Sequence, residues 1–186
     1  MSIQDESRPG RLAGRKALIT DGDSGLGREV SLAFAREGAD LAIGYRGEDP
    51  DAAETTAALA RAAGAHVALL PGDLGDEGVC GDVVDRAAER LGGLDTLVMI
   101  ERVVRGNLPT LRWLCRAAMS HLHAGSAIIA TSPMAMSSIV TPAALRRIRG
   151  RGIRMRGIAP SLAATHREQL TALYIALAAH EEPVGH

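Results

Sequence analysis

From Lys16 onward, short apolar runs alternate with segments that have the periodicity of amphipathic helices. The apolar runs predict six strands, over residues 17–20, 39–44, 65–70, 94–100, 127–130 and 152–158. Helical patterns separate them: one opens at Gly25, a second has Asp49 as its N-cap before Pro50, and a third is capped by Asp76. Because each right-handed crossover places a helix on a face of the sheet, this alternation predicts a doubly wound parallel α/β sheet of about six strands, with helices on both faces.

The second half of the chain is less regular than the first. The segment before the sixth predicted strand leaves room for at most two helical turns, over residues 142–149. A last helix is predicted over residues 167–179, and nothing after His180 resembles a strand. We therefore expect a fold that is shortened in its C-terminal half. Residues 1–11 are predicted to be a flexible arm, and residues 12–186 to form a single domain.

Composition excludes several classes of protein. The chain has 186 residues, a formal net charge of -1 and 2% aromatic residues, which argues against nucleic acid or an anionic membrane as a partner. The longest charge-free run contains Gly125, Pro133 and Pro142, so it does not predict a membrane helix. Two cysteines, Cys80 and Cys115, make no disulfide framework. We expect a cytoplasmic protein.

The first predicted strand runs directly into a glycine-rich turn, residues 20–27, which opens a helix. Glycines let the backbone turn tightly and let a pyrophosphate approach the helix N-terminus. This turn and several other segments resemble the short-chain dehydrogenase/reductase family; the others are residues 12–20, 35–40, 71–74, 91–95, 152–154 and 159–160. The resemblance covers nearly the whole chain from Arg11. It implies a Rossmann-like fold that binds NAD or NADP and transfers hydride to or from a carbonyl or alcohol.

The resemblance also implies a set of cofactor-binding residues. In chain order these are Gly22, Ser24, Gly25, Gly27, Arg46, Asp73 and Thr165. In the family, the residue at Asp73 contacts the adenine, the residue at Thr165 holds the nicotinamide amide, and a basic residue at Arg46 favours the 2′-phosphate of NADP. The alternative interpretations are that Asp73 is only a turn residue and that Arg46 is a solvated surface charge.

The chain departs from the family pattern in the turn and at the catalytic residues. Asp21 stands where the family has its first turn glycine, so its carboxylate would face the pyrophosphate unless it tilts outward. The family pairs a catalytic tyrosine with a lysine four residues later. Here neither Tyr45 nor Tyr174 has a lysine at that spacing, and Lys16 is the only lysine. We therefore expect no standard carbonyl reduction, and NAD(P) binding that is weakened or lost.

Polar residues that follow the predicted strands are the remaining candidates for catalysis: Glu101, Ser132 and His166. Glu101 and His166 could form a general acid/base pair if their loops converge. The alternative is a surface carboxylate and a helix-capping histidine. His121 and His123 are two residues apart, which does not place them on one helix face, and no metal site is predicted.

Three classes of function remain open. The favoured hypothesis is a repurposed enzyme of secondary metabolism that binds a small apolar organic molecule and performs non-redox acid/base chemistry, as a cyclase, isomerase or lyase. The alternatives are a non-catalytic binding or scaffolding protein, and a divergent NAD(P)-dependent oxidoreductase with an unfamiliar proton donor. A homo-oligomer with an altered interface is also expected, because the short segment 142–149 leaves apolar surface around Trp113.

Overall fold

The computed structural model describes residues 10–100, 108–131, 141–158 and 167–179. The strands are β1 (Lys16–Thr20), β2 (Asp40–Tyr45), β3 (Val67–Pro71), β4 (Thr96–Met99), β5 (Ala127–Ala130) and β6 (Arg154–Gly157). The helices are α1 (Gly25–Arg36), α2 (Pro50–Ala62), α3 (Glu77–Leu91), α5 (Leu108–Ala118), α7 (Pro142–Gly150) and α8 (Arg167–Ala179). None of these helices is long and apolar enough to cross a bilayer.

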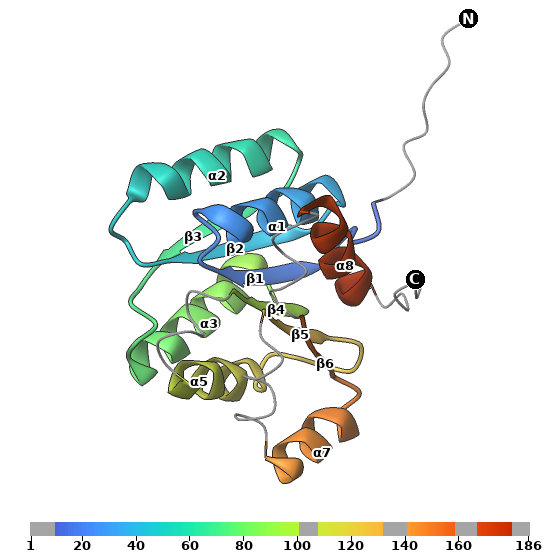
Figure 1. Ribbon diagram of the computed structural model, residues 1–186. Helices are drawn as coiled ribbons and strands as arrows, with labels where there is room; N and C mark the ends of the chain where they lie inside the picture. The colour runs from blue at the N-terminus through green and yellow to red at the C-terminus, as the bar shows by residue number, and fades with distance from the viewer. Residues whose placement is uncertain (1–9, 101–107, 132–140, 159–166, 180–186) are drawn as a thin grey trace, which may run out of the picture.

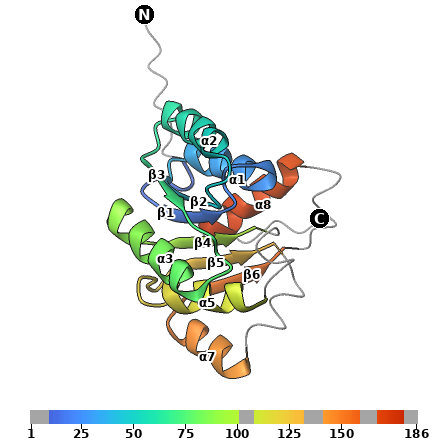
Figure 2. The same ribbon diagram turned by 90° about the vertical axis from the view of Figure 1, so that its left-hand side faces the viewer.

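The six strands form one parallel sheet in the order β3-β2-β1-β4-β5-β6. One face is covered by α1, α2 and α8, and the other by α3, α5 and α7 (Figures 1 and 2). The chain winds outward from β1 in one direction and then returns to β4 to wind outward in the other. The predicted Rossmann-like doubly wound fold is confirmed, and its ligand crevice is expected at the carboxyl ends of β1 and β4, where the order reverses.

Local sequence signals account for where most helices begin and end. Asp49 accepts a hydrogen bond from the Ala52 amide at 2.9 Å at the start of α2, and Asp76 caps α3 in the same way. Gly92 ends α3 with a φ of 69°, in the left-handed region that glycine adopts without strain. Carboxylates at these N-termini satisfy backbone N–H groups that have no partner inside the helix.

The C-terminal half differs in detail from the prediction. α7 has nine residues, which is slightly longer than the two turns expected, because Thr141 caps it and it continues to Gly150. β6 is shorter than the predicted run 152–158, because only residues 154–157 pair with β5. α8 has the bounds that its pattern predicts.

Candidate dinucleotide site at the carboxyl ends of the strands

The β1–α1 turn is held in a conformation that depends on glycine. Gly25 has a φ of 50°, and a Cβ atom added there would meet no atom within 4 Å. At Gly27 an added Cβ would lie 2.0 Å from the carbonyl oxygen of Asp21, so α1 approaches the turn too closely for any side chain. A close approach of helix and turn is what brings a bound pyrophosphate near the first turn of α1.

The N-terminus of α1 suits an anion. No acidic residue lies in its first turn, and the side chain of Ser24 makes no capping hydrogen bond to the helix. The amides of a first helical turn have no intrahelical partner, and the helix dipole adds a partial positive charge. The turn residues therefore fit the diphosphate of a dinucleotide, apart from one residue.

Asp21 is the residue of the turn that does not fit a diphosphate. Its φ is 49°, the left-handed region where the family has a glycine. The residue is buried, with 8% of its surface exposed, so the outward tilt that would move its carboxylate into solvent is not observed. A buried carboxylate beside the first turn of α1 opposes binding of an anion there.

Arg28 anchors the turn to α2, a role that the sequence did not reveal. Its guanidinium donates to the carbonyl oxygen of Asp23 at 2.7 Å, to the hydroxyl of Thr56 at 2.9 Å and to the carbonyl oxygen of Ala52 at 3.2 Å. These bonds hold the turn in place before any ligand binds. No local motif identifies Arg28, because its partners on α2 are more than 20 residues away.

Arg46 and Asp73 come together at the ends of β2 and β3. Nη2 of Arg46 lies 3.6 Å from a carboxylate oxygen of Asp73, and Nη1 lies 3.9 Å from Glu48. Asp73 also accepts a hydrogen bond from the Gly75 amide, as a turn residue does. The side chain of Arg46 is 56% exposed. Such pairs contribute little to stability, so Arg46 can exchange its partners for a ligand phosphate at small cost.

Both tyrosines are buried, and the lysine lies at the amino ends of the strands, away from the crevice at their carboxyl ends. The hydroxyl of Tyr174 is 2.6 Å from that of Thr131, which donates to the carbonyl oxygen of Met99. Lys16, at the start of β1, donates from Nζ to the carbonyl oxygen of Gly92. We expect Tyr174→Phe to lower the free energy of unfolding by about 1 kcal/mol in urea titrations, because a buried hydrogen bond is lost. An unchanged value would show that the phenol has no such structural role.

The remaining predicted site residues, Glu101, Ser132, Thr165 and His166, lie outside the described residues. Within the described part of the chain, no cluster of three or more His, Cys, Asp or Glu could hold a metal ion. His121 instead contacts Asp85 at 2.6 Å, and His123 contacts Asp95 at 2.9 Å.

Comparisons with known proteins agree with this geometry. A sequence model of the family described as short chain dehydrogenase matches residues 15–151. The chain is 37% identical over 185 residues to the oxidoreductase YhxD of Bacillus subtilis, covering 81% of this chain and 62% of that protein. It is 35% identical over 154 residues to NADPH-dependent aldehyde reductase 1 of Arabidopsis thaliana, covering 70% and 54%. A Burkholderia cenocepacia short chain dehydrogenase, solved in complex with NADP, has a TM-score of 0.70 and 26% identity, covering 81% of this chain and 75% of that one.

The chain spans less than two thirds of the length of these two curated relatives. The alignment to YhxD runs over 185 positions but includes only 81% of this chain, so YhxD has additional residues inside the aligned region. The short segment between β5 and β6 predicts such a difference, because it leaves this chain with fewer internal residues than YhxD.

The favoured functional hypothesis is wrong. The relatives that match these residues are named oxidoreductase, aldehyde reductase and dehydrogenase. These names indicate redox chemistry rather than the non-redox chemistry of a cyclase, isomerase or lyase. The hypothesis rested on the missing tyrosine–lysine pair, which in the family donates or removes the proton. In dinucleotide-dependent enzymes the cofactor supplies or accepts the hydride, and this chain retains the tight glycine turn between β1 and α1.

Proposed function

This chain belongs to the short-chain dehydrogenase family, and from that premise we propose that it acts as an oxidoreductase dependent on a nicotinamide dinucleotide, with NADP(H) preferred. The observation that carries the proposal is the β1–α1 turn, where Gly27 admits no Cβ and Gly25 has a positive φ. Support for NADP(H) comes from Arg46 at the end of β2, and from relatives described as NADPH-dependent or solved with NADP.

Each part of the chain has a distinct role in this proposal. The first-turn amides of α1 would hold the diphosphate, Arg46 would pair with a 2′-phosphate, and Asp73 would contact the adenosine. The dinucleotide, when bound, supplies or accepts the hydride. Thr20 holds the crevice together, because its hydroxyl accepts a hydrogen bond from the Ile100 amide at 3.0 Å and so joins the ends of β1 and β4.

The proton requires a donor other than a tyrosine–lysine pair. The chain has one lysine, which lies at the amino end of β1, whereas the crevice lies at the carboxyl ends of the strands. We propose that Glu101 or His166 transfers the proton and that Ser132 orients the substrate. Each of these residues follows a strand in the sequence, and the crevice lies at the carboxyl ends of the strands. The substrate class that fits the proposal is a small apolar carbonyl compound or the corresponding alcohol.

The cofactor assignment is tested by titrating NADPH and NADH against the protein and following the nicotinamide fluorescence. We expect Arg46→Ala to weaken NADPH binding about tenfold and to leave NADH binding unchanged, because only NADPH carries the 2′-phosphate. Arg61→Ala is the matched control, since Arg61 is also an exposed arginine paired with a carboxylate, Glu54. Equal losses for the two cofactors would contradict the role of Arg46, and silence of both at millimolar concentration would contradict the proposed function.

The proposal also includes a homo-oligomeric assembly and a cytoplasmic location. A homo-oligomer with an altered interface is supported by the short α7, which offers less surface than a longer helix would. A cytoplasmic location is supported by two cysteines that are both free and buried. Sedimentation velocity of the purified protein tests the first of these, and a monomer across micromolar concentrations would contradict it.

A further inference from the structure

One arginine connects two segments that lie far apart in the sequence. Arg28 is the fourth residue of α1, and its Nε and Nη2 both donate to the carbonyl oxygen of Asp23, at 3.1 and 2.7 Å. Nε also donates to the hydroxyl of Thr56, and Nη2 to the carbonyl oxygen of Ala52, both on α2. We call this set of hydrogen bonds the Arg28 clamp. It joins the β1–α1 turn to the first half of α2.

Thr56 completes the clamp from the side of α2. The residue is fully buried, and its hydroxyl oxygen lies 3.1 Å from the carbonyl oxygen of Ala52 and 3.3 Å from that of Asp23. Within the described ranges, every hydrogen bond of Arg28 goes to a neutral carbonyl or hydroxyl oxygen. A polar network whose members satisfy one another in a buried setting favours one fixed arrangement.

The clamp lies beside the loop that carries Arg46. β2 ends at Tyr45, Arg46 follows it, and α2 begins at Pro50. The amide of Ala52 donates to the side chain of Asp49, and its carbonyl oxygen accepts from the clamp. Residues 46–49 are therefore fixed at one end by the sheet and at the other by a clamped helix. α1 and α2 pack side by side on the same face of the sheet (Figures 1 and 2), so the clamp sets how far the turn lies from Arg46.

This separation matters for a ligand that must reach both places. NADPH would bring its diphosphate to the first turn of α1 and its 2′-phosphate to Arg46, whereas NADH would need only the turn. When two contacts belong to one ligand, the second forms at a high effective concentration only if the two sites are held at a matching distance. The turn also has a bond of its own to β2, from the Gly22 amide to the Gly44 carbonyl oxygen at 3.2 Å, which does not depend on the clamp.

We propose that Arg28 is a positioning residue for NADP(H) selectivity, because its clamp holds the β1–α1 turn and Arg46 at the separation at which one ligand reaches both. This role rests on the proposed function, since it requires that the turn and Arg46 bind the same dinucleotide. Arg28 acts through the elements that it joins and not by contact with a phosphate. A planar guanidinium can donate to three acceptors at fixed angles, which a lysine ammonium cannot do.

The variants Arg28→Lys and Thr56→Val test the clamp by titration with NADPH and NADH. Arg28→Lys keeps the charge and removes the fork, and Thr56→Val keeps the shape of the side chain and removes the hydroxyl. We expect NADPH affinity to fall about tenfold in the first and about fivefold in the second. NADH affinity should change less than about twofold in both, because NADH has no phosphate for Arg46 to bind.

Matched controls come from the same two helices. Arg36→Lys changes an exposed arginine near the end of α1. Thr55→Val removes an exposed hydroxyl of α2 that donates to the carbonyl oxygen of Asp51 at 2.8 Å. Neither control should change the affinity for NADPH by more than about twofold. Thr56→Ser retains the hydroxyl, so it is expected to restore the affinity that Thr56→Val loses.

Fragments of the cofactor separate positioning from a general loss of structure. Adenosine 2′,5′-bisphosphate carries one phosphate for each place, adenosine 2′-monophosphate carries only the one for Arg46, and adenosine 5′-monophosphate carries only the one for the turn. In both clamp variants the bisphosphate should bind about five- to tenfold more weakly, and each monophosphate should change less than about twofold. A damaged fold would weaken all three.

Three results would overturn the role of Arg28: equal losses for NADPH and NADH, unchanged NADPH affinity in both clamp variants, or equal losses for the bisphosphate and the monophosphates. NADPH binding that depends on Arg46 but not on Arg28 or Thr56 would remove the clamp's role and leave the proposed function intact. If the unaltered protein bound neither cofactor at millimolar concentration, the proposed function would fail, and the role of Arg28 would fail with it.

Discussion

Replacing Gly27 by alanine is expected to lower the free energy of unfolding by about 3 kcal/mol and to abolish NADPH binding. The new Cβ would lie 2.0 Å from the backbone oxygen of Asp21, a distance that real contacts do not reach. Neither group is a flexible side-chain end, so α1 and the turn must move apart. Urea denaturation gives the loss of stability, and a fluorescence titration gives the loss of binding.

Gly81→Ala is the matched control for this prediction. Gly81 lies inside α3, and an added Cβ there would meet no atom within 4 Å. Because alanine favours a helix more than glycine does, this substitution should raise stability by about 0.5–1 kcal/mol. If the two variants changed stability by the same amount, the close approach of α1 to the turn would not be what requires glycine at position 27.

Replacing Asp21 by glycine is expected to raise the affinity for NADPH by tenfold or more. A carboxylate about 4 Å from a phosphate opposes its binding by roughly 1 kcal/mol in water and by several kcal/mol near a protein surface, and 1.4 kcal/mol is a factor of ten. Glycine also removes the side chain from a position with a φ of 49°. Stability should change by less than about 1 kcal/mol, because the unfolded chain gains flexibility as the strain is relieved.

Asp21→Asn separates the two contributions. Asparagine has nearly the same shape and tolerates the left-handed region, so its gain in affinity measures the charge alone. Asp23→Asn, in the same turn, is the control for a general change in charge. If Asp21→Asn left the affinity for NADPH unchanged, the Asp21 carboxylate would not oppose the phosphate. The presence of Asp21 in place of the family's turn glycine would then have a consequence other than weakened binding.

Local patterns in the sequence were enough to place the elements of the fold. Apolar runs marked the strands, Asp49 and Asp76 marked the starts of helices, and the turn glycines marked the tight turn between β1 and α1. These signals are readable because each depends on residues a few positions apart, whose backbone hydrogen bonds and side-chain periodicity are decided locally. The missing tyrosine–lysine pair was also readable, but the non-redox function drawn from it was wrong.

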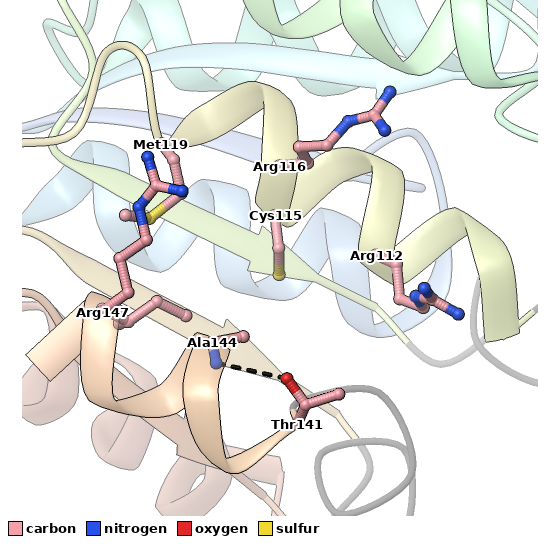
Figure 3. A pocket seen from close by; sticks show the side chains of 8 residues that line it. Arg112, Cys115, Arg116, Met119, Thr141, Ala144 and Arg147 are labelled. Atoms are coloured by element: carbon pink, nitrogen blue, oxygen red, sulfur yellow. Dashed lines mark hydrogen bonds between the residues drawn. The ribbon is translucent and has the colours of Figure 1, made fainter.

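Contacts between distant parts of the chain required the tertiary structure. The anchoring of the turn by Arg28, the burial of Asp21 and the pairing of Arg46 with Asp73 depend on how helices and strands pack, and their partners lie on different elements. A cavity of about 300 Å³ between α5 and α7 (Figure 3) belongs to the same class, because it exists only where two helices about 30 residues apart lie side by side. Sequence periodicity describes which face of an element is apolar, whereas the gap left between two such faces is decided by the volumes of the side chains that meet there.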